Sequence, residues 1–299
     1  MRLSTSLLAL ACTAALAGCQ PASTPQANDT SPAPAAAPAA APVPQAQAVN
    51  AADETRQRIE AILASAHRSD ADKARDPYRH PAQTLAFFGV TPESTVVEIT
   101  PGGGWYADIL APLLRPHGRY VAATWDDSLP DQPEYYARLN ARMAEKIAAA
   151  PEVYGEPLVI RFDPAAPSFG EPGSADVVLT FRNAHNWISN GIGHAYFSAF
   201  FEVLKPGGVL GVTDHRAKGE APTDGKSGYV TEQQIIDLAT AAGFQLAERS
   251  EINANPNDTA DHPKGVWTLP PSFALGDEDR EKYAAIGESD RMTLKFVKP

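Results

Sequence analysis

The chain has 299 residues, with 36 Asp and Glu against 25 Lys and Arg, which gives a formal net charge of −11. This surplus of acid excludes a general nucleic-acid binder, because such proteins need clustered Lys and Arg to displace counterions from phosphate. A hydrophobic fraction of 43% is ordinary for a globular protein and excludes wholesale disorder. Away from the N-terminus no apolar run is long enough to cross a membrane, so no internal span is expected.

The first eighteen residues have the features of an export signal. Arg2 is followed by an apolar segment at 7–17 that is too short to span a bilayer as a helix, and small residues precede Cys19. This pattern resembles the lipobox of bacterial lipoproteins, in which the cysteine takes a diacylglycerol. The resemblance implies a signal peptide over 1–18 and a lipid anchor on Cys19. Because Gln20 rather than Asp follows, it implies a periplasm-facing protein at the outer membrane. A plain secretory signal with an incidental cysteine is the alternative.

Acylation of Cys19 would leave the mature chain without a free thiol or a disulfide, because Cys12 is removed with the signal. Thiol nucleophiles and zinc–thiolate sites are then excluded. Residues 19–52 are rich in Pro and Ala and carry a single charge, Asp29. Such a composition cannot bury enough apolar surface to offset its ordering entropy. We therefore predict a disordered tether over 19–52.

From Asp53 onward, helical and strand patterns alternate, which favours one α/β domain over 53–299 with a doubly wound parallel sheet. The helices are predicted from Asp53 to residue 66, at 81–88, around 109–114, at 134–149, around 196–204, and from Thr231 to Gly243. The strands are predicted at 95–100, 119–124, 158–162, 175–181, 209–213, 244–252 and 292–297. The long stretch 253–290 is predicted to form a lid or a wall of the substrate site. The helix at 53–66 is expected to close the cofactor side.

A glycine-rich segment, Glu98-Ile-Thr-Pro-Gly-Gly-Gly104, lies between the first predicted strand and the next helix. Glycines at this place allow a ligand to approach the backbone closely. An acid at the end of the strand suits a cationic or hydroxyl-bearing ligand better than a pyrophosphate. A second glycine turn, Lys205-Pro-Gly-Gly, precedes the fifth strand. The pattern Gly102-x-Gly104-x-x-Ala107 also satisfies the dinucleotide motif, so a nicotinamide-dependent oxidoreductase is a less favoured alternative.

Together these features resemble class I S-adenosylmethionine-dependent methyltransferases, in which an acid and alternating glycines follow the first strand. The resemblance covers nearly all of 93–252 and includes the strand at 292–297. It implies a Rossmann-like, doubly wound, mostly parallel seven-stranded sheet with a C-terminal antiparallel strand, and S-adenosyl-L-methionine as cofactor. The stretches 181–187, 251–256 and 287–292 are also similar to the exported or lipoprotein group of bacterial predicted methyltransferases.

The resemblance also implies which residues contact the cofactor. They are Glu98, Thr100, Gly102, Gly104, Asp126 and Asp163. Thr100 stands where the family has its first glycine, which is a departure from the motif. Thr124 occupies the usual place of the acid that ends the second strand, and Asp126 comes two residues later. Either Asp126 reaches the ribose from a longer loop, or that contact is missing. Asp163 matches the acid that faces the adenine amino group.

Polar residues follow the fourth and fifth strands, whose carboxyl ends meet at one edge of the sheet. The candidates on the reacting side are Arg182, Asn183, His185 and His215. Either histidine could act as a general base, and Arg182 or Arg216 could anchor an anionic acceptor. Trp187 and Trp267 are candidates to stack an aromatic acceptor or, more simply, to pack in the core.

A metal site is not predicted. His185, His194, Asp214 and His215 could converge, but the sequence has no H-x-x-x-H or H-E-x-x-H spacing. The favoured function is therefore an S-adenosylmethionine-dependent methyltransferase in the cell envelope, which acts on a small molecule or an envelope component. The membrane is expected as a partner through the lipid anchor alone. The alternative is a lipoprotein that keeps the fold as a binding or scaffold module without turnover.

Overall fold

A computed structural model describes residues 45–219 and 224–299. The predicted signal peptide, Cys19 and most of the predicted tether lie outside the described residues. Among the residues described, no helix combines the length and the apolar character that crossing a membrane requires.

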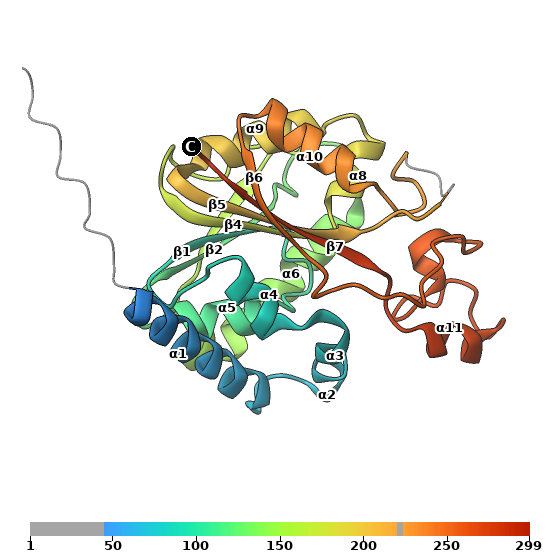
Figure 1. The fold of residues 1–299 in the computed structure, drawn as a ribbon, viewed down its shortest axis with the longest axis horizontal. Coiled ribbons are helices and arrows are strands. Elements are labelled where there is room, and N and C mark those ends of the chain that lie inside the picture. Colours follow the sequence, from blue (N-terminus) through green and yellow to red (C-terminus); the bar gives the residue numbers. More distant parts are fainter. Residues whose placement is uncertain (1–44, 220–223) are drawn as a thin grey trace, which may run out of the picture. The chain divides into compact units, whose positions relative to one another are not determined.

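Seven strands form one sheet in the order β3-β2-β1-β4-β5-β7-β6 (Figure 1). The strands are β1 Thr95–Ile99, β2 Arg119–Trp125, β3 Leu158–Phe162, β4 Ala175–Phe181, β5 Leu204–His215, β6 Gln245–Ser250 and β7 Arg291–Val297. The first five run parallel, and β7 is antiparallel to both of its neighbours. This confirms the predicted fold class, a mostly parallel seven-stranded sheet with a C-terminal antiparallel strand. The strand order reverses between β1 and β4, where open α/β sheets place their ligands.

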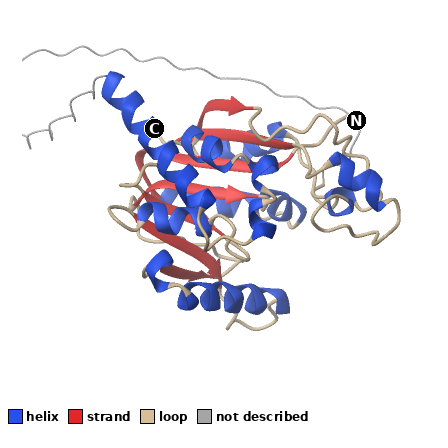
Figure 2. Ribbon diagram, turned by 90° about the horizontal axis from the view of Figure 1, so that it is seen from below, coloured by secondary structure: helices blue, strands red, loops and turns tan. Residues whose placement is uncertain are grey.

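Helices cover both faces of the sheet (Figure 1, Figure 2). They are α1 Gln45–Ala64, α2 Asp70–Lys73, α3 Asp76–Arg79, α4 Pro81–Phe87, α5 Ala107–Leu114, α6 Glu134–Ala149, α7 Pro151–Tyr154, α8 Ala184–Ser189, α9 Gly193–Val203, α10 Glu232–Ala241, the 3-10 helix η1 Gly265–Thr268 and α11 Arg280–Ile286. Alternate residues of the strands face opposite sides, so Val96 packs with α1, α4 and α5 while Val97 packs with α8, α9 and α10. Both faces of the central strands are therefore buried.

Most predicted boundaries lie within about two residues of the observed ones, and the largest differences are at two element starts. Helix α1 begins at Gln45, eight residues before Asp53, so it includes the end of the segment predicted as tether. The reason is that no proline follows Pro44 in that segment, and its Ala and Gln residues favour a helix. Strand β5 begins at Leu204, and the Lys205-Pro-Gly-Gly turn lies inside it, where the register with β4 shifts.

The segment 253–290 joins β6 to β7 and contains η1 and α11. Because β7 is antiparallel and its first residue, Arg291, pairs with His215 at the end of β5, this segment enters the sheet at the carboxyl edge of the parallel strands. It therefore lies on the side of the sheet where a ligand site is expected.

Candidate functional site

A cleft of about 430 Å³ opens at the carboxyl ends of β1, β2, β4 and β5. Its volume is in the range of sites that hold small molecules. Its lining includes Asp72, Arg75, Arg79, Glu98, Thr100, Gly102, Trp105, Trp125, Tyr135, Arg142, Arg182, Asn183, His185, His215 and Trp267. Most of the candidates named from the sequence, from both the glycine segment and the strand ends, therefore meet in one cavity. Helices α2 and α3, rather than α1, supply its N-terminal wall.

The glycine segment turns sharply after β1. Thr100 has φ 48°, a left-handed conformation that usually needs glycine, so the threonine keeps the backbone shape of the motif at the cost of strain. Gly102 has φ 61° and lines the cleft, and a Cβ on it would meet no protein atom within 4 Å. Gly104 differs, since a Cβ there would lie 2.8 Å from the Sδ of Met143. Gly102 therefore leaves room for a ligand, whereas Gly104 allows α6 to pack.

Glu98 is the penultimate residue of β1 and is buried at the cleft wall. Its Oε2 accepts a hydrogen bond of 2.7 Å from the Tyr120 hydroxyl. Burial raises the pKa of this carboxyl to about 7, although the Tyr120 hydrogen bond lowers it in part. A cationic ligand placed against Glu98 would favour its ionised form.

The structure does not bring Asp126 and Asp163 into the cleft lining. Each carboxylate is engaged in its own turn: Asp126 accepts from the backbone N–H of Ser128 at 3.0 Å, and Asp163 from that of Ala165 at 2.8 Å. The last residue of β2 is instead aromatic. Trp125 lines the cleft and packs edge-to-face against Tyr135, with ring centroids 5.8 Å apart.

His185 is held by a buried carboxylate. Its Nδ1 lies 2.9 Å from Oδ1 of Asp214, which is fully buried at the end of β5. Asp214 also accepts the backbone N–H groups of His185 and His215, at 3.1 and 2.8 Å. An imidazole that donates Nδ1–H to a carboxylate keeps Nε2 free to accept a proton. His185 thus has the geometry of a general base at the cleft wall.

His215 has a different environment, although its ring centroid is only 5.4 Å from that of His185. Its Nδ1 bonds to the Ser289 hydroxyl. Burial lowers the pKa of His215 well below its ordinary value, and the nearby His185 and Arg182 lower it further. His215 is therefore neutral at physiological pH and a weaker base than an ordinary histidine.

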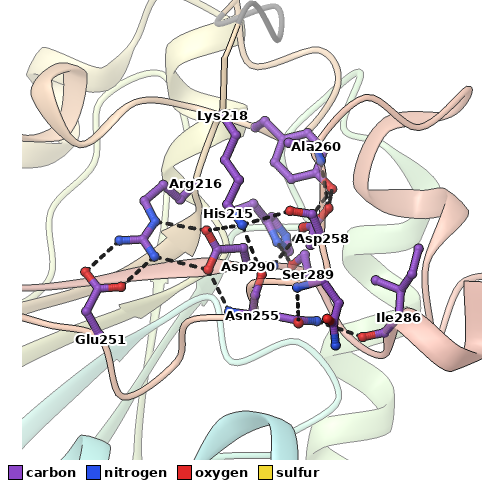
Figure 3. Close-up of polar contacts among 12 residues, drawn as sticks. His215, Arg216, Lys218, Glu251, Asn255, Asp258, Ala260, Ile286, Ser289 and Asp290 are labelled. Atoms are coloured by element: carbon purple, nitrogen blue, oxygen red, sulfur yellow. Dashed lines mark hydrogen bonds and ion pairs between the residues drawn. The ribbon is translucent and has the colours of Figure 1, made fainter.

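The loop that carries Ser289 is fixed by two buried carboxylates, as Figure 3 shows. Asp258 accepts the backbone N–H of Asp290 at 2.7 Å, and Asp290 accepts that of Asn255 at 2.7 Å. Arg216 pairs with Asp290 at 3.0 Å and with Glu251 at 2.6 Å. The cleft is not lined by Arg216, so this arginine holds the loop rather than an acceptor.

Two further candidates also have structural contacts. Asn183 lines the cleft and donates to the carbonyl oxygen of Ile99 at 3.1 Å, which ties the end of β4 to the end of β1. Trp187 packs in the core, stacked on Tyr196 with centroids 4.3 Å apart. Trp267, by contrast, is 40% exposed and lines the cleft beside His185.

One ligand atom from each of His185, Asp214 and His215 lies within 4.8 Å of the others, and residues of these types also bind metal ions. His194 is exposed and lines a separate pocket. Both oxygens of Asp214 already accept N–H groups from the two histidine residues. The carboxylate therefore serves as the partner of the imidazole in this arrangement.

Arginines form another part of the cleft wall, and Arg182 is the only one of Arg75, Arg79 and Arg182 that was named from the sequence. Glu288 pairs with Arg75 at 2.6 Å, with Arg79 at 3.2 Å and with Arg291 at 2.9 Å. Burial raises the pKa of Glu288, but the arginines outweigh it and lower the pKa to about 2. Arg75 and Arg79 were missed because α3 is a single turn without an amphipathic pattern. Their spacing of four residues, which places both on one helix face, was the available signal.

The sequence matches no protein-family model and no curated protein. Solved structures do match. A SAM-dependent methyltransferase from Aquifex aeolicus is 14% identical with a TM-score of 0.50, over 82% of this chain and 98% of its own. The [4+2]-cyclase SpnF is 18% identical with a TM-score of 0.54, over 79% of this chain and 86% of its own. Since one is named a methyltransferase and the other a cyclase, the likeness identifies the fold and not the reaction. The chain has the fold of the class I S-adenosylmethionine-dependent methyltransferases.

Proposed function

We propose that this protein is an S-adenosylmethionine-dependent methyltransferase of the cell envelope, anchored through Cys19, that methylates a small molecule or an envelope component in the cleft. The lipobox-like sequence before Cys19 supports the anchor. The main support for the activity is the open space at Gly102. This residue lies where the strand order reverses and lines the same cleft as the buried acid Glu98.

The residues present fit this cofactor. When bound, it supplies an electrophilic methyl group on a sulfonium centre. Gly102 allows its close approach to the backbone, and Glu98 offers a carboxylate to a positively charged group. Trp125 and Tyr135 offer aromatic surface to a nucleoside in place of the acid that is usual after the second strand.

The chain's own chemistry centres on His185. For a hydroxyl, ammonium or acidic-carbon acceptor, Nε2 of His185 takes the proton, while Asp214 orients the ring and stabilises the resulting imidazolium. Alignment of the two reactants supplies much of the remaining rate. Trp267 offers an apolar surface to the acceptor beside His185.

A second candidate is a binding lipoprotein without turnover. The observation that favours it is the placement of Asp126 and Asp163 outside the cleft lining, because both were expected to contact the nucleoside. A nicotinamide-dependent reaction is disfavoured by Glu98, whose carboxylate would face a pyrophosphate.

Calorimetric titration of the purified full chain with S-adenosylmethionine, S-adenosylhomocysteine and NAD tests the proposal. Both sulfur nucleosides are expected to bind and NAD is not. The matched variants are Gly102→Ala and Gly173→Ala, because both glycines have a positive φ (61° and 67°) and open space at Cβ, but only Gly102 lines the cleft. Gly102→Ala should weaken nucleoside binding at least tenfold and Gly173→Ala should not. Failure of the sulfur nucleosides to bind the parent chain would contradict the proposal.

A further inference from the structure

The arginine wall of the cleft carries more positive charge than its single acid offsets. Arg75, Arg79, Arg182 and Arg291 all act electrostatically on Glu288. The two carboxylates that line the cleft are bonded elsewhere, Asp72 to Ser69 and Glu98 to Tyr120, and Glu288 lies behind the lining. Four guanidinium groups, of which those of Arg75, Arg79 and Arg182 belong to residues that line the cleft, therefore share the carboxylate of Glu288.

Several of these guanidinium nitrogens have no hydrogen-bond partner among the described residues. Arg75 and Arg79 use their Nε atoms for Glu288, and the Nη2 atom of each is buried and unpaired. Arg79 is 3% exposed and is held over the Trp105 ring, 4.5 Å from its centroid. A buried N–H group without a partner is costly, and native proteins rarely leave one so. The arrangement therefore lacks an acceptor.

Arg182 also lines the cleft, and its backbone has a left-handed conformation. It follows β4 with φ 61°, the left-handed region that favours glycine, and its N–H is tied to the carbonyl oxygen of Thr213 at 2.7 Å. No described residue makes a hydrogen bond with its guanidinium, which lines the cleft. Backbone strain of this kind is concentrated at functional sites in proteins. Burial lowers the pKa of Arg79 well below its ordinary value and the nearby Arg182 lowers it further, although Glu288 raises it in part.

We propose that Arg75, Arg79 and Arg182 form a binding site for a carboxylate in the cleft. The two oxygen atoms of a carboxylate can accept from the two unpaired Nη2 atoms of Arg75 and Arg79, and the guanidinium of Arg182 completes the site. The proposal rests on the proposed function, since the carboxylate belongs either to the methionyl part of the cofactor or to the methyl acceptor. In both cases Glu288 positions Arg75 and Arg79 through its ion pairs with them.

Three probes separate these sources in calorimetry on the full chain. S-adenosylhomocysteine carries the amino-acid carboxylate, 5′-methylthioadenosine is the same nucleoside thioether without it, and succinate is a free carboxylate. The test variant is Arg182→Gln, and Arg182→Lys retains the charge. The control is Arg119→Gln, an exposed arginine at the opposite, amino end of β2.

If the site binds the carboxylate of the cofactor, Arg182→Gln should weaken the binding of S-adenosylhomocysteine at least tenfold and that of 5′-methylthioadenosine less than twofold. The affinity of Arg182→Lys for S-adenosylhomocysteine should lie between those of Arg182→Gln and the parent chain. If the site binds a carboxylate of the acceptor, Arg182→Gln should bind both nucleosides as the parent chain does and should lose succinate binding. The site is refuted if Arg182→Gln binds all three probes with the same affinities as Arg119→Gln. It is also refuted if Arg182→Gln loses affinity for S-adenosylhomocysteine and 5′-methylthioadenosine to the same extent. Succinate binding that depends on Arg182, in a chain that binds neither nucleoside, would preserve the site and refute the methyltransferase.

Arg182→Gly is the control that separates loss of the guanidinium from loss of the fold. Because glycine tolerates φ 61°, this variant should melt at the same temperature as the parent chain or higher, yet show the same loss of binding as Arg182→Gln. A restored affinity in Arg182→Gly would show that backbone shape, and not the guanidinium, is what the ligand needs, and would overturn the proposal.

Discussion

Thr100 and Arg182 end neighbouring parallel strands, and both hold left-handed backbone conformations, at φ 48° and 61°. Each non-glycine residue in this region costs about 1–2 kcal/mol. The strain therefore gathers where β1 and β4 diverge and where the cleft opens. A fold that needed only stability would place glycine at both positions, so the side chains retained there are the first ones to examine for a role in binding.

Glu98 gives the site a pH dependence that can be measured. Its folded pKa of about 7 lies above its ordinary value of 4.5, so the native state binds this proton more tightly than the unfolded chain. Its contribution to stability is present below about pH 4.5 and is lost as the pH rises to 7. Glu98→Gln should therefore be more stable than the parent at pH 8, by about 1–3 kcal/mol. Urea unfolding at pH 5 and pH 8 measures this; an equal difference at both pH values would count against the raised pKa.

His185 is predicted to act in turnover and not in cofactor binding. His185→Gln should lower the rate of methyl transfer by about 100-fold or more while the affinity for S-adenosylhomocysteine changes less than threefold. The rate is measured as labelled methyl groups transferred from S-adenosylmethionine to an envelope extract. His194→Gln, at an exposed histidine outside the cleft, is the control. A retained rate in His185→Gln would remove this residue from the mechanism.

The residues that were placed from the sequence share one property, which is that each lies at or just after the carboxyl end of a predicted strand. Glu98, Gly102 and His185 could be named for that reason, since strand ends meet at one edge. Asp126 could not be placed, because its direction depends on a turn with Ser128 that the sequence pattern does not specify. Arg79 could not be ranked above other arginines, because its importance comes from a partner far away in the chain.

At the level of elements, helix α3 depends on a tertiary contact rather than on its own sequence. It is a single turn, and single turns are not stable in isolation. Arg75 is 213 residues from its partner Glu288, and Arg291 donates to the carbonyl oxygen of Tyr78 at 2.6 Å. Hydrophobic periodicity located the longer helices and every strand of the sheet. It has no signal for an element that is held by ion pairs.

Glu288→Gln should therefore detach α3 from the end of β7. Removing this buried carboxylate leaves three arginines without their partner, for which about 3–5 kcal/mol of destabilisation is expected at pH 7. Since the folded pKa of about 2 lies below the ordinary 4.5, this stabilisation is complete above about pH 4.5 and is lost as the pH falls to 2. The variant should show a flatter dependence of unfolding free energy on pH in that window.

Urea unfolding at pH 7 and pH 3 makes this comparison. Glu281→Gln, at an exposed position on α11, is the matched control and should behave like the parent at both values. If Glu288→Gln unfolds as the parent does at pH 7, the ion pairs contribute too little to hold the cleft wall.

At the scale of the whole molecule, the alternation of strands and helices was sufficient to predict the sheet, because each βαβ unit has one favoured hand and connections are short. The segment 253–290 was correctly assigned between the last two strands, but its inner organisation was not predicted. Its order comes from buried carboxylates such as Asp258 and Asp290, which bond to backbone N–H groups. Polar networks of this kind leave no periodic trace in a sequence.

The membrane anchor is a prediction about the whole molecule as well. Cys19→Ser should move the protein from the membrane fraction to the soluble fraction of cells that export it, because acylation of that thiol is the expected attachment. Fractionation followed by immunoblotting measures the change, and labelling with a fatty-acid analogue should disappear in the same variant. An unchanged membrane association would contradict the anchor.

The position of β7 has a consequence for how this protein is made. This strand is the last in the chain, yet it lies between β5 and β6 inside the sheet. A partly synthesised chain therefore has an unpaired edge at β5, and it also lacks Glu288, which holds the cleft wall. Contacts over such long sequence separations form late in folding. Ligand affinity is thus expected to depend on β7 and on the segment before it, and a product that stops before β7 is expected to aggregate and to lose the cleft wall at the same time.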